Sequence, residues 1–225
     1  MRREIGDAVG IAVCLSSLAN VAQRRGDMEQ AVALAEQALV LQRELGSTGE
    51  IADSLRVLGS VARARGDYEH AARLFEEALV LERQAGRPRG MGVVLRSLGS
   101  VAARQGDYGR AAAMIREALA ILRKVSDRAA IATTLEALAY VSSAMELSAP
   151  AVRLLGVADA LRDEIGAPRT FVGQAEYDQH LGAARALLGE AAFTSAWAAG
   201  RALPLDQAIA AALDGRATEG SVLYP

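Results

Sequence analysis

Two arginines that lie 40 residues apart, Arg56 and Arg96, are the residues of this sequence best suited to bind a ligand. Ser60 and Ser100 each follow an arginine by four residues, about one helical turn, so each pair would share a helix face. Guanidinium groups form charge-assisted, bidentate hydrogen bonds with carboxylates and phosphates. The pattern therefore predicts a site for a carboxylate, an acidic peptide segment or a phosphate. The alternative is a solvated helix face, the usual role of charged residues.

Catalytic chemistry would need several groups that converge on one point. His180 lies four residues after Glu176 on a predicted helix, where the carboxylate could orient the imidazole. The nearby sequence supplies neither a nucleophile nor a second ligand, so we interpret the two residues as a surface pair at helical spacing. Cys14 is the only cysteine, which excludes an intramolecular disulfide, and we expect it to be a buried small hydrophobic residue. The sequence predicts a non-enzymatic protein without cofactor or metal.

The composition predicts an all-α protein. Hydrophobic residues make up 52% of the 225 residues but aromatic residues only 4%, and alanine and leucine, which dominate, are strong helix formers. The net charge of −2 gives no general attraction for nucleic acids or anionic membranes, so we expect no direct binding to either. No apolar run reaches the roughly 20 residues that a membrane-spanning helix needs. We therefore expect a cytoplasmic protein.

The sequence repeats itself every 40 residues. Similar segments begin at Arg24, Ala64 and Arg104, and each contains a Gly-Asp pair followed by apolar residues at helical spacing. A second series of turn residues has the same interval and comprises Gly6, Gly46, Gly86, Ser126 and Gly166. Two turn markers in each period indicate two helices in each period. The chain is therefore predicted to contain four helix pairs, in the units 7–46, 47–86, 87–126 and 127–166.

Gly66 and Asp67 illustrate how the sequence separates the two helices of a unit. A glycine just beyond a helix end can adopt the left-handed conformation, and the aspartate that follows can cap the next helix. The fourth unit has Glu146 where this glycine is expected. Leucines form one stripe on the first helix of each unit, and we expect Leu15 and Leu18 of the first unit to be buried.

These positions resemble the tetratricopeptide repeat. The family pattern appears as Leu58-Gly59, Gly66-Asp67-Tyr68, Ala71, Phe75 and Ala78. The period is longer than the usual ~34 residues, so each helix is longer, and the repeats look like those of large bacterial transcriptional regulators and of kinesin light chains. The resemblance implies a right-handed α-α superhelix, a solenoid of helix pairs closed by C-terminal capping helices. The resemblance gives almost no information about function.

The resemblance also implies a partner-binding groove. In tetratricopeptide solenoids the first helix of each pair lines the concave face, and its residues that do not pack are free to contact a ligand. Carried over position by position, the groove comprises Ser16, Asn20, Gln23, Arg56, Ser60, Arg63, Val93, Arg96, Ser100, Arg104, Thr133, Glu136 and Tyr140. We expect it to bind a protein or peptide segment, such as an acidic one, or a small effector.

The two ends of the chain depart from the repeat. Residues 1–6 align with the end of a second helix, so they are either the last turn of a preceding helix in a longer array or a frayed start. The open N-terminal face that results could join copies of the chain into a homo-oligomer. After Gly166 we expect capping helices over 167–215, which cover the apolar face of the last repeat, and a mobile tail over 216–225.

The C-terminal region resembles the end of a class of bacterial regulators. Segments 151–168 and 176–213 look like the C-terminal end of LuxR/SARP-type regulators, which join a switch ATPase to a tetratricopeptide sensor array. Because Lys124 is the only lysine, the chain has no phosphate-binding loop ending in Gly-Lys-Ser or Gly-Lys-Thr. The resemblance implies the sensor or assembly module of a signal-responsive transcriptional regulator. The alternative is a stand-alone adaptor or homo-oligomerising scaffold.

Overall fold

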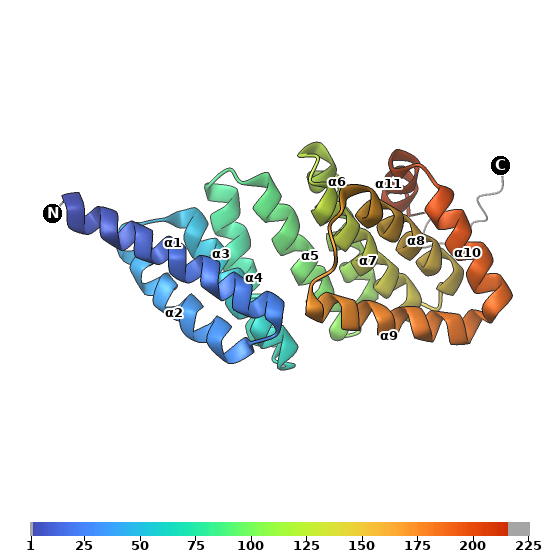
Figure 1. The fold of residues 1–225 in the computed structure, drawn as a ribbon, viewed down its shortest axis with the longest axis horizontal. Helices are drawn as coiled ribbons and strands as arrows, with labels where there is room; N and C mark the ends of the chain where they lie inside the picture. Colours follow the sequence, from blue (N-terminus) through green and yellow to red (C-terminus); the bar gives the residue numbers. More distant parts are fainter. Residues whose placement is uncertain (1, 216–225) are drawn as a thin grey trace.

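The computed structural model describes residues 2–215, and within this range all regular structure is helical (Figure 1). The helices are α1 (Arg2–Arg25), α2 (Met28–Leu45), α3 (Thr48–Ala64), α4 (Tyr68–Gln84), α5 (Pro88–Arg104), α6 (Tyr108–Lys124), α7 (Arg128–Ala144), α8 (Ser148–Ile165), α9 (Phe171–Leu188), α10 (Glu190–Ala202) and α11 (Leu205–Leu213). The predicted fold class is confirmed. The expected tail over 216–225 lies outside the described residues.

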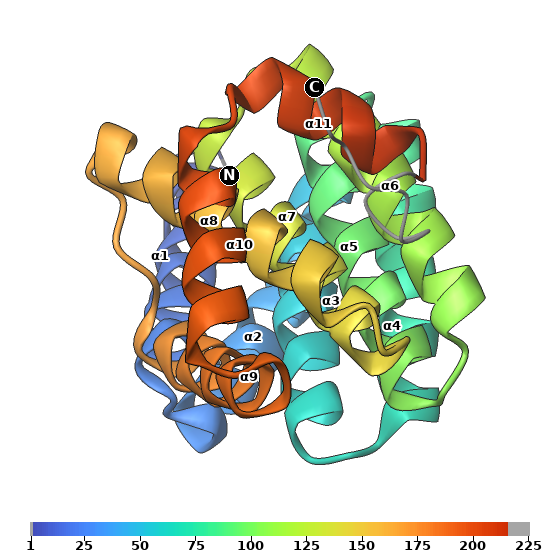
Figure 2. The ribbon, with the colours of Figure 1, turned by 90° about the vertical axis from the view of Figure 1, so that its right-hand side faces the viewer.

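The first eight helices form four pairs that stack side by side (Figures 1 and 2). Each helix packs against the next one along the chain, so that the second and third pairs are covered on both sides by their neighbours. The odd-numbered helices line the concave side of the stack, and the even-numbered helices form its outer layer. The result is the right-handed α-α superhelix that the repeat predicts, with an apolar core between the two layers.

The tight turns form as the Gly-Asp pairs predict. Gly66 has a φ of 82°, and the carboxylate of Asp67 accepts a 3.1 Å hydrogen bond from the backbone N–H of His70. Ser126 and Glu146, which stand in for glycine in two later turns, have positive φ values of 54° and 64°. Side chains disfavour this conformation, so the packing of α6, α7 and α8 must offset a local strain at these two turns.

The first helix departs from the expectation. α1 runs without interruption over 24 residues, whereas α3, α5 and α7 have 17 residues each. Gly6, which was expected to form a turn, lies inside α1. A glycine inside a helix costs only about 1 kcal/mol relative to alanine. No helix precedes α1 within the described residues, so no packing contact there requires a turn at Gly6.

Two side chains of α1 that were expected in the core are exposed. Leu18 exposes 53% of its surface, and Cys14 is also exposed. Leu15 is only partly buried. In later units the corresponding stripe is covered by the preceding helix pair, and α1 has no such neighbour within the described residues. The prediction of a buried Leu18 and Cys14 was therefore wrong.

The helices after Gly166 cover the last repeat and also reach back along the chain. α10 packs closely along α8, with Phe193 buried at their contact and Trp197 packed beside it. α11 lies against α6 and α8 (Figure 2). α9 begins beside the C-terminal part of α1, which it contacts, and runs from there to the far end of the array (Figure 1). The capping role holds for α10, but the path of α9 was not expected.

Replacing Gly200 by alanine should detach α10 from α8 and destabilise the protein. A Cβ atom at Gly200 would lie 2.2 Å from the carbonyl oxygen of Arg153, a backbone atom that cannot rotate away. Overpacking of this kind costs about 1–3 kcal/mol in free energy of unfolding, measurable by urea denaturation. Gly182→Ala on α9 is the matched control, because a Cβ there meets no atom within 4 Å. Equal losses for the two variants would contradict the prediction.

Candidate functional site

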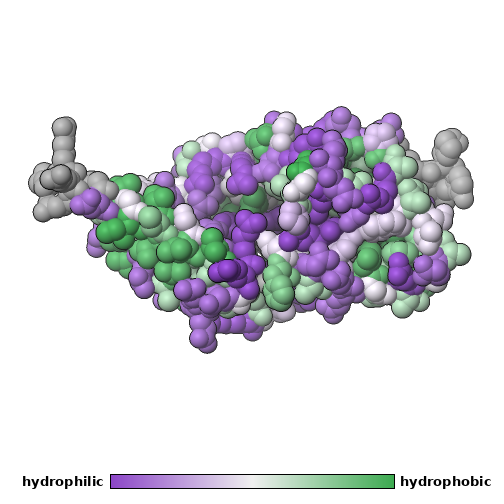
Figure 3. Space-filling view, viewed as in Figure 1, coloured by the Kyte–Doolittle hydropathy of each residue, from purple (hydrophilic) through white to green (hydrophobic). Residues whose placement is uncertain are grey.

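A groove of about 1030 Å³ lies on the concave side of the helix stack. Its walls come from α1, α3, α5 and α7, and its rim includes the α4–α5 turn and the α8–α9 segment. Figure 3 shows hydrophilic residues gathered over the middle of this side, between α1 and α9. The charged lining residues are Arg24, Arg56, Arg87, Arg89, Arg96, Arg162 and Arg169, with Glu50, Asp53 and Glu136. Seven guanidinium groups and three carboxylates line the groove, and three further carboxylates, those of Glu82, Asp127 and Asp159, pair with lining arginines. The region therefore keeps only a small excess of positive charge, in a chain of net charge −2.

A polar network holds Arg56 in the N-terminal half of the groove. Its guanidinium donates a 2.7 Å hydrogen bond to Oδ1 of Asn20 and lies 3.9 Å from the carboxylate of Asp53. Arg87 donates to the same Asp53 at 2.8 Å, and its Nε lies 3.4 Å from the buried carboxylate of Glu82. Burial raises the pKa of Glu82 and lowers the pKa of Arg56. Asn20 of the first unit and Arg56 of the second, both predicted groove residues, therefore already contact each other.

The inner and outer helices of a unit are joined by a polar pair at one repeated position. In the first unit, Nε2 of Gln42 donates a 2.6 Å hydrogen bond to Oγ of Ser16, which lies 26 residues earlier. In the fourth unit, Nε of Arg162 donates a 2.8 Å hydrogen bond to Glu136, again 26 residues earlier. The pairs differ in chemistry, but in both units the polar group on the groove wall has its partner on the outer helix.

The third unit lacks this partner. Arg56 and Glu82 occupy the paired positions of the second unit and attract each other electrostatically, but in the third unit Arg96 is matched by the buried Leu122. Within residues 2–215, Arg96 makes neither a hydrogen bond through its guanidinium nor an ion pair. Burial, with the neighbouring Arg56, lowers its pKa to about 10, so it remains charged at neutral pH. Arg96 is therefore the group in the groove best placed to bind an added anion.

Glu136, which was predicted to contact a ligand, is engaged by the chain itself. Its Oε1 accepts 2.8 Å hydrogen bonds from Nε of Arg162 and from Nε of Arg169. Arg169 also pairs with Asp159, and its guanidinium lies 3.5 Å above the ring of Tyr177. All the groups of this cluster are largely buried. The cluster fixes the segment before α9 to α7 and α8.

α9 covers the C-terminal part of the groove wall. Arg104, on α5, forms a 3.0 Å ion pair with Glu176 of α9. The ring of Tyr140, on α7, stacks on His180 of α9 with 3.9 Å between ring centroids. Burial lowers the pKa of His180 and so favours its neutral form. The interpretation of Glu176 and His180 as a simple surface pair was wrong, because both residues contact the predicted groove.

The predicted groove residues are distributed over two cavities. The 1030 Å³ groove is lined by Ser16, Asn20, Gln23, Arg56, Val93, Arg96, Thr133 and Glu136. A second cavity of about 310 Å³, beside α9, is lined by Arg63, Ser100, Arg104 and Tyr140. Ser60 lines neither, and its hydroxyl donates a 2.9 Å hydrogen bond to the carbonyl of Arg56. Ser100 donates to the carbonyl of Arg96 in the same way. The protons of both hydroxyls are therefore used within their own helices.

Five arginines of the groove, Arg24, Arg87, Arg89, Arg162 and Arg169, were not predicted from the sequence. Arg87 lies in the α4–α5 turn, and Arg162 lies on α8, an outer helix, so neither belongs to an inner-helix face. The repeat contains a signal for Arg162, which follows Glu136 by the same interval that separates Gln42 from Ser16. Arg169 follows the last repeat and has no counterpart in it, so no pattern could have placed it.

The stacked helix pairs and their charged concave groove define an α-α solenoid of the tetratricopeptide type. Two family models described as tetratricopeptide repeat match the chain, over residues 10–81 and 94–129. Repeats of this kind typically form protein-binding scaffolds that are not themselves catalytic. No helix of the described residues is both long and apolar enough to cross a membrane.

Solved structures with the same fold are known. BtubC (BKLC) from P. vanneervenii aligns over 100% of this chain and 91% of its own length, with 19% identity and a TM-score of 0.62. A putative kinesin light chain of Podosopora anserina, with nearly identical TPR-like repeats, aligns over 92% and 96%, with 20% identity and a TM-score of 0.56. None of the curated proteins matches the sequence. At these identities the likeness shows the fold.

Proposed function

We propose that this chain is a non-enzymatic scaffold that binds an acidic segment of a partner protein in the 1030 Å³ groove. The observation that carries the proposal is the guanidinium of Arg96, which has no hydrogen-bond or ion-pair partner within residues 2–215, in a lining of seven arginines and three carboxylates. An anionic side chain placed against Arg96 would gain charge-assisted hydrogen bonds without breaking an existing pair. Arg56, beside it, has one strong partner in Asn20 and retains further donors for the same ligand.

The shape of the groove favours a peptide over a small effector. Its lining draws on four inner helices, so a ligand that used all of it would have to span the four repeats. Sites for small molecules are mostly apolar with a few polar groups, whereas ten of the 26 residues that line this groove are charged. A flexible segment with several carboxylates satisfies such a lining better than one compact molecule does.

The test measures binding of a fluorescein-labelled peptide of alternating glutamate and alanine by fluorescence anisotropy. Arg56→Glu with Arg96→Glu should weaken binding by about 100-fold, the effect of losing two hydrogen bonds to charged groups. Circular dichroism should show unchanged helix content.

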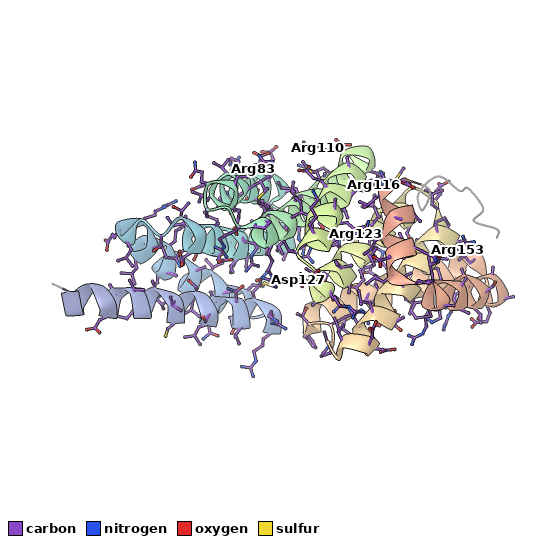
Figure 4. The ribbon with its side chains drawn as sticks, turned by 90° about the horizontal axis from the view of Figure 1, so that it is seen from above. Arg83, Arg110, Arg116, Arg123, Asp127 and Arg153 are labelled. Atoms are coloured by element: carbon purple, nitrogen blue, oxygen red, sulfur yellow. The ribbon has the colours of Figure 1, made fainter. Side chains whose placement is uncertain are left out.

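The matched control is Arg83→Glu with Arg110→Glu. It makes the same change in charge at two arginines that lie on the edge of the molecule away from α1 and α9 (Figure 4). These two substitutions should leave the affinity within a few-fold of wild type. Equal losses in the two double variants would indicate general charge attraction, and absence of binding to the wild-type chain, or full affinity in the groove variant, would also contradict the proposal.

Within this proposal, the partner is a component of a bacterial signal-responsive transcriptional regulator, for which the chain is the sensor or assembly module. The support is the resemblance of segments 151–168 and 176–213 to the ends of such regulators. Affinity capture followed by mass spectrometry, with the groove variant as control, tests it. Specific enrichment of a switch ATPase or a DNA-binding regulator would support this role. Loss of such enrichment, with other partners retained, would favour a stand-alone adaptor.

A further inference from the structure

An apolar seam runs along the side of α1 that faces away from the rest of the stack. Ile11, Cys14, Leu18 and Val21 follow one another at intervals of three, four and three residues, which places them on one face of the helix. All four side chains are exposed. Figure 3 shows hydrophobic residues gathered over α1. Contiguous apolar patches of this kind on a folded protein commonly mark an interaction site.

In the other repeats, the surface that corresponds to this seam is buried in the contact between neighbouring helix pairs. Val21 is 50% exposed, whereas its counterparts Val61, Val101 and Val141 are 1%, 1% and 2% exposed. Val61 is buried because α1 and α2, the preceding pair, cover it with alanine side chains. The seam of α1 is therefore an inter-repeat surface that lacks its neighbour in the described chain.

The same holds for the position of Cys14. Its counterparts one, two and three units later are Ser54, Val94 and Thr134, and all three are buried. A small side chain at this position is the normal content of a packed contact between repeats. The exposure of Cys14 therefore follows from the missing neighbour and not from a polar role.

We propose that a second copy of this chain covers the seam, so that two molecules associate through α1 in a head-to-head dimer. Head-to-tail stacking would require an open face at the other end of the array, but α10 already covers α8 there. The remaining self-association is a contact of α1 with α1, which has two-fold symmetry and closes after two copies.

An antiparallel arrangement makes the seam complementary to itself. A two-fold axis midway between Cys14 and Leu18 places Cys14 opposite the other copy's Leu18, and Ile11 opposite the other copy's Val21. The same axis places Asp7 opposite Arg25, four residues beyond the apolar residues at each end, and both are exposed. Each seam thus ends in two opposite-charge pairs that favour the antiparallel over the parallel orientation.

Sedimentation equilibrium of the full chain, over about 1 to 200 µM, tests this proposal in the range where a small interface associates. We expect a monomer–dimer equilibrium that Leu18→Glu weakens at least tenfold. Val40→Glu is the matched control, because Val40 is similarly exposed but lies on the outer layer in α2. A wild-type chain that is monomeric throughout, or a Leu18→Glu chain that dimerises as well as wild type, would overturn the proposal.

Charge reversal tests the orientation. Asp7→Arg or Arg25→Asp alone should weaken the dimer, because each places like charges opposite one another, and the double variant should restore it. Failure of the double variant to recover affinity would overturn the antiparallel arrangement. The acidic peptide binds a different surface, so Leu18→Glu should bind it with wild-type affinity. A negative result for the dimer proposal therefore does not affect the groove proposal, and the reverse also holds.

Discussion

Replacing Glu136 by alanine is expected to lower the free energy of unfolding by about 3–5 kcal/mol, as removal of one partner from a buried ion pair typically does. The carboxylate of Glu136 accepts hydrogen bonds from Arg162 and Arg169, and all three side chains are about nine-tenths buried. Without Glu136, two guanidinium groups would share a poorly solvated space and repel each other. Urea denaturation followed by circular dichroism measures the loss.

Glu164→Ala is the matched control for this variant. Glu164 pairs with Arg128, but both side chains are largely exposed, so its removal should cost at most about 1 kcal/mol. Hydrogen exchange adds a local readout. Because Arg169 fixes the segment before α9 to α7 and α8, the amides of α9 should exchange faster in Glu136→Ala. Equal stability losses at Glu136 and Glu164 would show that the buried cluster contributes no more than a surface ion pair.

Phe75→Ala is expected to cost about 3–5 kcal/mol, the usual range for truncating a buried phenylalanine. Phe75 is fully buried, and its ring lies against Gly59 of α3, where even one added carbon would clash with it. Truncation would leave a cavity between the two helices of the second unit. Since α-α repeats pack only on their neighbours, the damage should spread to the contacts with the first and third units.

The matched control for Phe75 is Phe171→Ala. Phe171 has the same side chain but is 77% exposed at the start of α9, so its truncation should change the free energy of unfolding by no more than about 0.5 kcal/mol. Thermal and urea denaturation of both variants compare a core position with a surface position of identical chemistry. A comparable loss at the two sites would contradict the packing described for the second unit.

The repeat, the turns and the inner helix faces could be predicted from the sequence because they depend on neighbouring residues. Gly66 takes a left-handed conformation that glycine tolerates, and Asp67 caps the helix that begins next to it. The resemblance to the tetratricopeptide repeat, aligned through this spacing, implied that Asn20, Arg56 and Arg96 face the concave side, and all three line one groove. These are local rules, applied once per unit.

The serine hydroxyls show where reading a helix face from the sequence falls short. Ser60 and Ser100 were expected to present donors to a ligand, but each hydroxyl donates to the carbonyl four residues earlier in its own helix. This local bond is always within reach of a helical serine, so the spacing of the residues does not distinguish the two outcomes.

By itself, the sequence determined a helical-repeat array with a positively charged concave side. Only the tertiary structure decided which groups of that side are free. Arg96 is unpaired because its outer partner position holds Leu122, while Arg104 is paired with Glu176, which lies 72 residues away on α9. Leu18 and Cys14 look like core residues in the repeat, but they are exposed because the helix pair that would cover them is absent from the described chain. Local patterns set helices and turns, whereas pairing and burial depend on which distant segment arrives as a neighbour.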